Sequence, residues 1–255
     1  MRRPTVAVPT MLRDAWHTLV PRRESPHGPL PPVLVVLTVV AGLVDAFSYL
    51  ALGHVFVANM TGNVVFIALA LAGEPGFSLT ASGLSLVAFV VGGIAAGRLG
   101  RLTGPHRGRQ LLALTGVQSV LLVAAFAAAA RLDQPFAGTA GYLLIGVTAL
   151  GMGMQGGLVQ RLRVPDLNTL VMTTTITSMA AGGWLGGGSD GRVGRRLVSV
   201  LSLAVGALIG GLIVRYATPA LTLLLAALLL AAVAGTAVAL ARSRRPWTTP
   251  RAPGG

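Results

Sequence analysis

One carboxylate stands inside an apolar stretch that is long enough to cross a bilayer. Asp45 lies past the middle of this first apolar segment, in the run VVAGLVDAFSYLAL, which carries no other charge. A carboxylate near the bilayer centre costs about 2.5–3.5 kcal/mol on insertion scales, so it normally faces a polar interior or a cavity. Asp45 is therefore a candidate for coupling a proton or cation to transport, or for contacting a substrate. The alternative is a hydrogen-bonded Asp45 that only fastens this helix to its neighbours.

A cluster of small polar residues follows a few positions later. It consists of Asn59, Thr61, Gly62 and Asn63. Asn and Thr are favoured at helix N-termini, so the cluster predicts a short helix that begins inside the membrane with unpaired backbone N–H groups. Those donors and the positive end of the helix dipole favour an anion or a polar carbonyl group. The alternative is that these side chains only satisfy the interrupted backbone, as irregular structure in a membrane requires.

A similar set of polar residues recurs in the second half of the chain. Gln155 stands where Asp45 stands in the first half, but its amide cannot titrate, so proton coupling would run through one half only. A polar cluster then runs from Asp166 to Thr177. Because both halves concentrate such residues, we expect one shared central site for a substrate or coupling ion. Its expected members are Asp45, Asn59, Thr61, Asn63, Gln155, Asn168, Thr173, Thr175 and Thr177.

The two halves resemble each other beyond these clusters. The run VVGGIAAG at 90–97 resembles AVGALIGG at 204–211, with Gly92 matching Gly206. The tetrapeptide at 42–45 matches 152–155, and the one at 60–63 matches 172–175. Each half therefore reads as a span, a half-helix and two more spans. Three crossings per half make the second copy enter from the opposite side, which predicts an inverted repeat of the kind found in secondary transporters.

Long apolar segments are the elements that must position these residues. Apolar residues make up 53% of the chain and charged residues only 11%, whereas a soluble domain carries roughly a quarter charged residues. A helix needs roughly 20 apolar residues to cross a bilayer. Six segments meet this requirement, and two are apolar but short. The long segments are about 33–52, 81–99, 110–130, 138–159, 197–215 and 218–241; the short ones are about 60–72 and 169–185.

Arginine placement decides between six and eight crossings. All 20 basic residues are Arg, and four of them fall in the connection 98–109. With eight crossings this connection would face outward, against the positive-inside rule. If the two short segments enter without crossing, the connection and both termini face the cytoplasm. The sequence thus predicts an all-α integral protein of a bacterial inner membrane, with six full transmembrane helices and two half-helices in a 3+3 inverted repeat.

The predicted organisation is a single transmembrane domain between two tails. We expect a cytoplasmic N-terminal tail over 1–30, the transmembrane domain over 31–241, and a basic cytoplasmic C-terminal tail over 242–255. The repeat halves cover about 31–130 and 138–241. Within the first tail, residues 10–20 form either a short interfacial helix or disordered chain. Gly92 and Gly206 belong to small-xxx-small patterns, which predict close helix crossings.

Several functions are disfavoured by what the chain lacks. It contains no Cys, which excludes disulfides and Cys-ligated metals, and no His/Asp/Glu spacing indicates a metal site. No Ser/His/Asp set is credible for hydrolysis, so we expect no enzymatic activity and no cofactor. The net charge of +13 lies at the ends of apolar segments rather than on one folded face, so we expect no nucleic-acid partner.

Two stretches resemble the hallmarks of a known family. AGLVDAFSYLALGHVFVANMTGN at 41–63 and GMGMQGGLVQRLRVPDLNTLVMTTTIT at 151–177 are similar to the YoaK-like bacterial membrane proteins, known as domain of unknown function 1275. The resemblance covers about residues 30–242. It departs at Gly156, Gly157 and Leu170, where the family's residues differ, and this weakens the transfer of contacts at those positions. The resemblance implies a permease and supplies no substrate.

The leading functional expectation is a small secondary transporter or permease. Its solute would be small and polar, with an anion favoured by the half-helix N-termini. A passive channel is one alternative, and a non-transporting scaffold or lipid-handling protein is another. The expected partners are membrane lipids and the solute, and a homodimer is left open.

Overall fold

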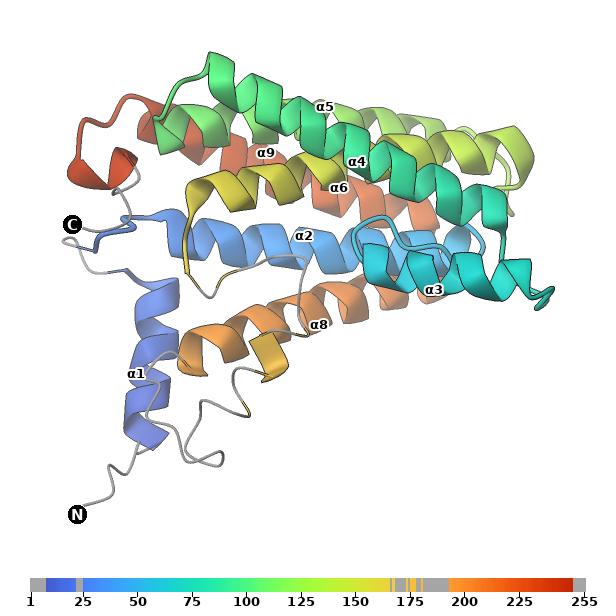
Figure 1. Cartoon of the computed structure of the whole chain (residues 1–255), viewed down its shortest axis with the longest axis horizontal. Coiled ribbons are helices and arrows are strands. Elements are labelled where there is room, and N and C mark those ends of the chain that lie inside the picture. Colours follow the sequence, from blue (N-terminus) through green and yellow to red (C-terminus); the bar gives the residue numbers. More distant parts are fainter. Residues whose placement is uncertain are drawn as a thin grey trace.

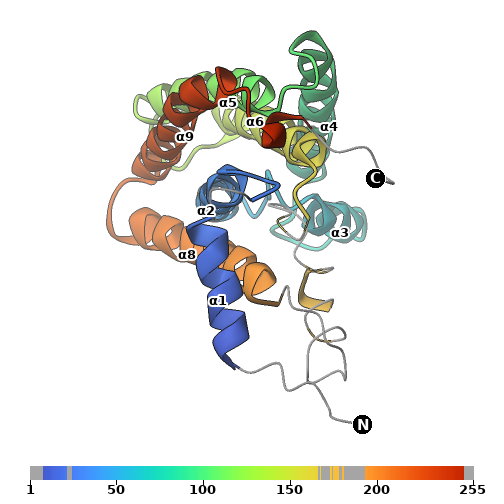
Figure 2. The same ribbon diagram turned by 90° about the vertical axis from the view of Figure 1, so that its left-hand side faces the viewer.

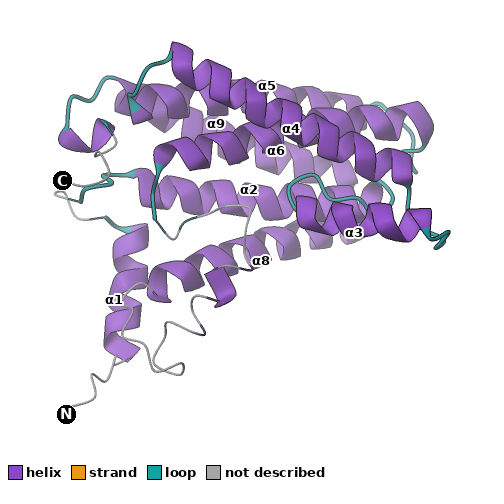
Figure 3. Cartoon of the chain, viewed as in Figure 1, coloured by secondary structure: helices purple, strands orange, loops and turns teal. Residues whose placement is uncertain are grey.

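The computed structural model describes residues 8–21, 25–165, 167, 173, 175–177, 180 and 193–249. Within these ranges every regular element is a helix (Figure 3). The elements are α1 (Val8–Leu19), α2 (Leu30–Ala51), α3 (Met60–Leu71), α4 (Leu79–Leu102), α5 (Arg107–Ala129), α6 (Gly138–Leu162), α8 (Val193–Tyr216), α9 (Pro219–Ala241) and the 3-10 turn η2 (Pro246–Thr248).

Six of the described helices are long and apolar enough to cross a membrane, namely α2, α4, α5, α6, α8 and α9. This confirms the six predicted spans and makes the chain a multi-pass membrane protein. The helices are longer than predicted at their arginine-rich ends. The predicted connection 98–109 shrinks to 103–106, because Arg is a good helix former whose long stem lets its charge reach water from the last turn.

The short helix α3 is confirmed as too short to cross. It has 12 residues, so it rises about 18 Å, whereas the hydrocarbon core is about 30 Å thick. It lies beside α4 toward one end of the bundle (Figure 1). The second predicted half-helix, 169–185, falls largely outside the described residues.

The bundle is built by exchange of helices between the two halves of the chain. α2 packs most extensively on α8, α4 packs most extensively on α6, and α5 pairs with α9. Viewed along the bundle, α2 lies near the centre with the other helices around it (Figure 2). The core accordingly includes Leu34, Leu37 and Leu43 of α2, all fully buried.

Glycines bring the crossing helices into direct backbone contact. A Cβ atom at Gly92 of α4 would collide with the carbonyl oxygen of Leu150 in α6. A Cβ atom at Gly206 of α8 would likewise collide with the carbonyl oxygen of Val39 in α2. The predicted close crossings at Gly92 and Gly206 are therefore confirmed.

The partner helices contribute glycines to the same two crossings. Gly42 of α2 meets the backbone of α8 at Leu203, and Gly153 of α6 meets the backbone of α4 at Phe89. Each crossing thus uses one glycine from each helix. The van der Waals contact made by bare backbone is the main source of helix association in lipid, where no hydrophobic force operates between helices.

These contacts occur in equivalent pairs. The α2 and α6 glycines are 111 positions apart, while their partners on α4 and α8 are 114 positions apart. They favour the inverted repeat, which stays a prediction. The contacts align Gly42 with Gly153, whereas the sequence comparison aligned it with residue 152, one position earlier. In this register the counterpart of Asp45 is Gly156 rather than Gln155. Low-complexity helical sequence gives little to distinguish the two alignments.

Arginines gather at one end of the bundle, which also carries α1 and η2 (Figure 1, left). We call it the arginine-rich end; it includes Arg101, Arg107, Arg161, Arg195 and Arg242. The predicted interfacial segment 10–20 is helical and lies across this end as α1. Asp14 Oδ2 accepts a hydrogen bond of 2.8 Å from the backbone N–H of Arg195, in the first turn of α8. A carboxylate at a helix N-terminus is favourable because it satisfies an unpaired donor.

Part of the C-terminal segment also packs on the bundle. Trp247 of η2 is buried, and its carbonyl oxygen accepts a hydrogen bond of 3.3 Å from Arg107 Nη1. Its indole ring lies where a side chain at Gly28 would stand. The segment predicted as a solvated tail therefore contributes one buried aromatic residue to the arginine-rich end.

Candidate functional site

The chain between α2 and α3 turns back into the bundle. After Ala51 it reverses direction, with Gly53 in a left-handed conformation (φ +85°) that a side chain would disfavour. We call residues 52–59 the re-entrant segment. Val55, Val57 and Ala58 within it are buried. A membrane interior offers no water to irregular backbone, so the segment must find hydrogen-bond partners within the protein.

Asp45 supplies two of these hydrogen bonds. Its Oδ1 accepts from the backbone N–H of Val57 at 3.0 Å and of Ala58 at 2.8 Å. Charge-assisted hydrogen bonds of this kind are roughly twice as strong as neutral ones. The carboxylate of the first span therefore fastens the re-entrant segment from one side.

Asn63 and Ser85 fasten the same segment from the other side. Asn63 Oδ1 accepts from the Phe56 backbone N–H at 2.9 Å, and Asn63 Nδ2 donates to the Phe56 carbonyl at 2.6 Å. Ser85 Oγ of α4 donates to that carbonyl as well, also at 2.6 Å. Both side chains are fully buried. We call Asp45, Asn63 and Ser85 together the polar clasp.

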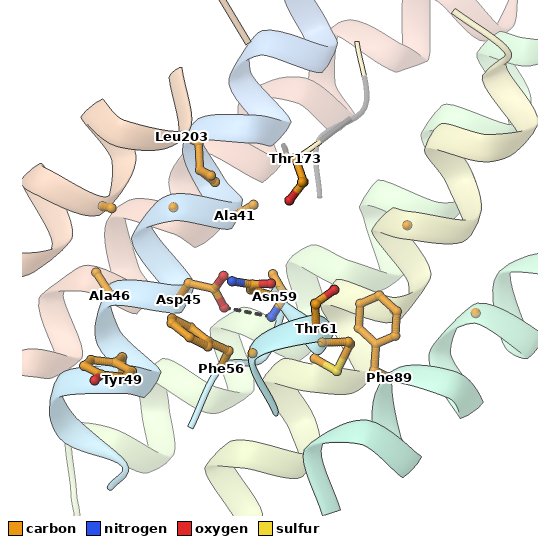
Figure 4. Close-up of a pocket in the computed structure, with 18 of the residues that line it drawn as sticks. Ala41, Asp45, Ala46, Tyr49, Phe56, Asn59, Thr61, Phe89, Thr173 and Leu203 are labelled. Carbon is orange, nitrogen blue, oxygen red and sulfur yellow. Dashed lines mark hydrogen bonds between the residues drawn. The ribbon is translucent and has the colours of Figure 1, made fainter. Parts of the chain in front are cut away.

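A cavity of about 1030 Å³ lies beside the polar clasp. Residues of α2, α3, α4, α6 and α8 line it, together with part of the re-entrant segment and Thr173. Figure 4 shows Asp45 and Asn59 near its centre, with Thr61 and Phe89 to the right and Thr173 above them. Asp45 stands 15 residues into α2, about 22 Å along the helix from its start. The cavity therefore reaches deep into the bundle.

Aromatic rings form one wall of the cavity and extend away from it. Tyr49 and Phe56 line the cavity and stack at a centroid distance of 5.0 Å and an interplanar angle of 22°. Phe56 stacks in turn on Phe66, 5.5 Å away, and Phe66 contacts Phe77 at 5.0 Å. Tyr49 also lies 6.3 Å from Phe66, so these rings form a cluster that links α2, the re-entrant segment, α3 and the connection to α4.

Glycines form much of the remaining wall. They come from α2, α3, α4 and α6: Gly42, Gly62, Gly93, Gly97, Gly153, Gly156 and Gly157. Gly156 is also the residue that the helix contacts pair with Asp45. One half of the bundle therefore places a carboxylate at this position and the other half leaves space.

The described residues of the cavity wall carry one charge of each sign. Asp45 and Arg161 both line it, and the two side chains form no ion pair with each other. Arg161 precedes the last residue of α6, at the arginine-rich end, and it packs against Gly100 of α4. Its Nε is buried and has no hydrogen-bond partner among the described residues. The two charges thus belong to different depths of the bundle.

The structure brings together four of the expected site residues. Asp45, Asn59, Thr61 and Thr173 line the cavity. Thr175 is buried and Thr177 is exposed, and neither is among the residues that line it. Asn168 lies outside the described residues.

Two expected site residues have another position. Asn63 belongs to the polar clasp, and Gln155 is buried between helices. Gln155 Nε2 donates to the carbonyl of Leu37 in α2 at 2.9 Å, and its Oε1 accepts from Gln118 Nε2 of α5 at 3.0 Å. Gln155 thus ties α6 to two neighbouring helices. It does not line the cavity, whereas the next residue of α6, Gly156, does.

The hydrogen bonds of Asp45 change the expected role of the half-helix start. Asn59 is the N-cap residue of α3, as predicted, but its side chain makes no capping hydrogen bond. The two N–H groups just before it already bind Asp45. The anion expected at this place is therefore the protein's own carboxylate.

Sequence reasoning did not single out Arg161, Gln160, Tyr49, Phe56 or Phe89 as part of the site. Arg161 was interpreted only as a topology-setting charge, and the aromatic residues as ordinary apolar positions. Their proximity depends on the crossing of α4 with α6 and on the re-entrant segment. The local signal that was present is the spacing of Tyr49 four residues after Asp45, which puts both on one face of a helix.

Known proteins resemble this chain. The family described as "Protein of unknown function (DUF1275)" matches residues 33–236. The UPF0700 transmembrane protein YoaK of Bacillus subtilis (strain 168) is 32% identical over 151 residues, which cover 58% of this chain and 64% of that protein. The match thus spans less than two thirds of that relative. No solved structure matches the chain.

Proposed function

The chain belongs to the DUF1275 family, whose function is unknown, and on that premise we propose that it is a secondary transporter for a small polar solute. The observation that carries the proposal is the cavity at the polar clasp, where an intramembrane carboxylate meets an interrupted helix. Interrupted helices near the midplane form the binding sites of many secondary transporters. An ionisable residue at that depth is costly and normally functional.

The polar clasp suggests how a proton could act on the cavity. Protonation of Asp45 would remove the negative charge that holds the N–H groups of Val57 and Ala58. The two hydrogen bonds would weaken, and the re-entrant segment would move more easily. In this mechanism Asp45 couples its protonation state to the opening of the cavity, while Asn63 and Ser85 keep the far side of the segment in place.

We place this transporter in a bacterial inner membrane with the arginine-rich end in the cytoplasm. The positive-inside rule supports that orientation, because both described ends of the chain and the 103–106 connection lie at this end. Reporter fusions at Gly104 and after the C-terminus should both give a cytoplasmic signal. An external signal at Gly104 would contradict the six-span topology in this orientation.

Flux measurements on proteoliposomes test the transport function. Purified protein would be reconstituted with a trapped pH-sensitive dye, and solutes of each charge class would be added outside. We expect a saturable proton movement with at least one class, lost in Asp45→Asn. Flux that does not saturate and ignores Asp45 would indicate a channel. No flux with any class from folded protein would indicate a scaffold or lipid-handling role. The proposal includes no enzymatic step, no cofactor and no nucleic-acid partner.

A further inference from the structure

The charge at the deep end of the cavity is negative. Among the described residues of the wall, the ionisable ones are Asp45, Tyr49 and Arg161, and only Asp45 is a carboxylate. The N–H groups of Val57 and Ala58, which would attract an anion, already bind Asp45 Oδ1. The backbone N–H of Asn59 also interacts with this carboxylate. A carboxylate has about four acceptor positions, so three backbone donors leave capacity for one more. A solute that reaches this depth therefore meets an acceptor.

The surfaces next to Asp45 suit the rest of an organic cation. The rings of Tyr49, Phe56 and Phe89 line the same cavity. An aromatic face attracts an ammonium group within about 6 Å, by about 0.5–2 kcal/mol depending on desolvation. The wall is otherwise mostly glycine, alanine and other apolar residues. The cavity is as large as the sites that bury drug-sized ligands, roughly 300–1,000 Å³.

We infer that the cavity takes a small organic amine with an apolar body, whose ammonium group binds Asp45 against the rings of Tyr49, Phe56 and Phe89. This inference rests on the proposed function, because it names the solute class of the same site. Gly156, which lines the same cavity and has no side chain, leaves room for the amine's body.

Proton and amine then compete for one carboxylate. Asp45 binds the ammonium group only when it is ionised, so amine binding weakens as the pH falls. Tyr49 and Arg161 are the other ionisable residues among the described residues of the wall. Release of one proton for each ammonium bound makes the expected cycle an exchange of protons for amines. Arg161 lies at the arginine-rich end, where its positive charge acts against the amine rather than for it.

A matched set of benzyl compounds tests the solute class. Benzylammonium, benzyl alcohol and benzoate share one body and differ in charge, and each would be titrated calorimetrically into purified full-length protein at neutral pH, where the ammonium group is protonated. We expect the cation to bind at least tenfold more tightly than the other two. Asp45→Asn should weaken cation binding at least tenfold, and Phe89→Leu several-fold. Arg161→Gln should tighten it, because a like charge is removed. Gly116→Ala, which faces open space in α5, is the matched control.

Each result decides the inference. Tighter binding of benzoate, or cation binding that survives Asp45→Asn in a folded protein, would overturn it. Weaker cation binding in Arg161→Gln would show that Arg161 supports the site, and would overturn the arrangement in which its charge acts against the amine. If Asp45→Asn does not fold, the pH dependence of cation binding to the unmodified protein takes its place, and a flat profile would overturn the inference.

The same probes separate this inference from the proposed function. Cation binding without flux into proteoliposomes would remove the transporter and leave the ligand class intact. Saturable flux of benzoate without cation binding would do the opposite. Flux of the cation that requires Asp45 would support both.

Discussion

The helix crossings and the re-entrant segment are held by different forces. At the crossings of α2 with α8 and of α4 with α6, backbone touches backbone through glycines, and no polar side chain is needed. The re-entrant segment is held by the polar clasp, three side chains that hydrogen-bond its backbone. Close packing changes little without unfolding, whereas a hydrogen bond can be exchanged for a proton, a water or a solute. The contrast indicates that the crossings keep the bundle rigid and that movement belongs to the segment.

The strongest way to break this contrast is to add volume at a crossing. Gly92→Leu and Gly206→Leu should each destabilise the protein by roughly 3 kcal/mol or more, because overpacking there pushes against backbone. Expression yield and thermal melting in detergent measure the loss. Gly116→Leu should melt like the unmodified protein, since its position faces open space. Equal melting of all three variants would contradict the close crossings.

A weaker effect is expected at the polar clasp. Asn63→Ala removes the two hydrogen bonds that Asn63 makes with the backbone of Phe56. The free energy of unfolding should fall by about 1–3 kcal/mol, the penalty for buried unpaired polar groups. Limited proteolysis or hydrogen exchange should localise the loosening to 52–59, in contrast to the global loss at the glycines. A uniform loss of protection over all helices would show that the clasp and the crossings form one unit.

The hydrogen bonds of the buried Gln155 test whether polar contacts between helices affect stability without affecting the cavity. Gln155→Leu breaks the link from α6 to Leu37 and Gln118 but keeps the volume. Interhelical hydrogen bonds in membranes contribute about 0.6 kcal/mol on average, with a maximum near 1.7, so we expect a small decrease in melting temperature. Amine binding should be unchanged, because Gln155 does not line the cavity. A variant that melts normally but binds no amine would place Gln155 in the site after all.

The smallest effect on stability is expected at Asp45, where the effect on function is largest. In Asp45→Asn the side-chain oxygen can still accept hydrogen bonds from Val57 and Ala58. The free energy of unfolding should therefore change by less than about 1 kcal/mol. The pH dependence of binding and flux should disappear, because Asn does not titrate. A destabilised variant that keeps the pH profile of the unmodified protein would instead assign Asp45 a purely structural role.

The sequence predicted features that depend on a single helix and missed those that depend on pairing. Hydropathy located all six spans and α3, since a bilayer sets the length of an apolar helix whatever it packs against. Gly92 and Gly206 were predicted because small residues three or four apart form one face. Asn63 was assigned to the site as part of the predicted half-helix start and Gln155 as the repeat counterpart of Asp45, but in the structure both side chains are buried and hydrogen-bond the backbone of another element. Such roles follow from which backbone group lies opposite, which no local pattern contains.

Asp45 shows why the two interpretations of an intramembrane carboxylate need not compete. The sequence left open whether it fastens helices or contacts a solute. Its Oδ1 hydrogen-bonds the re-entrant segment, and the same side chain lines the cavity. Arg161 was missed because a positive charge at a helix end is fully accounted for by topology, and only the crossing with α4 places it on the cavity wall.

The exchange of partners between the two halves also sets the order of assembly. α2 packs mainly on α8, which begins 142 residues after α2 ends. At a synthesis rate of about 5–20 residues per second, the first span waits roughly 7–30 s for its partner. During that time Gly42 and Asp45 have no helix to cover them from the second half. A ribosome-stalled chain that ends before α8 should therefore keep α2 beside the insertion machinery, where a photo-crosslinker at the exposed Leu50 of α2 would capture it, and release it once α8 has entered the membrane.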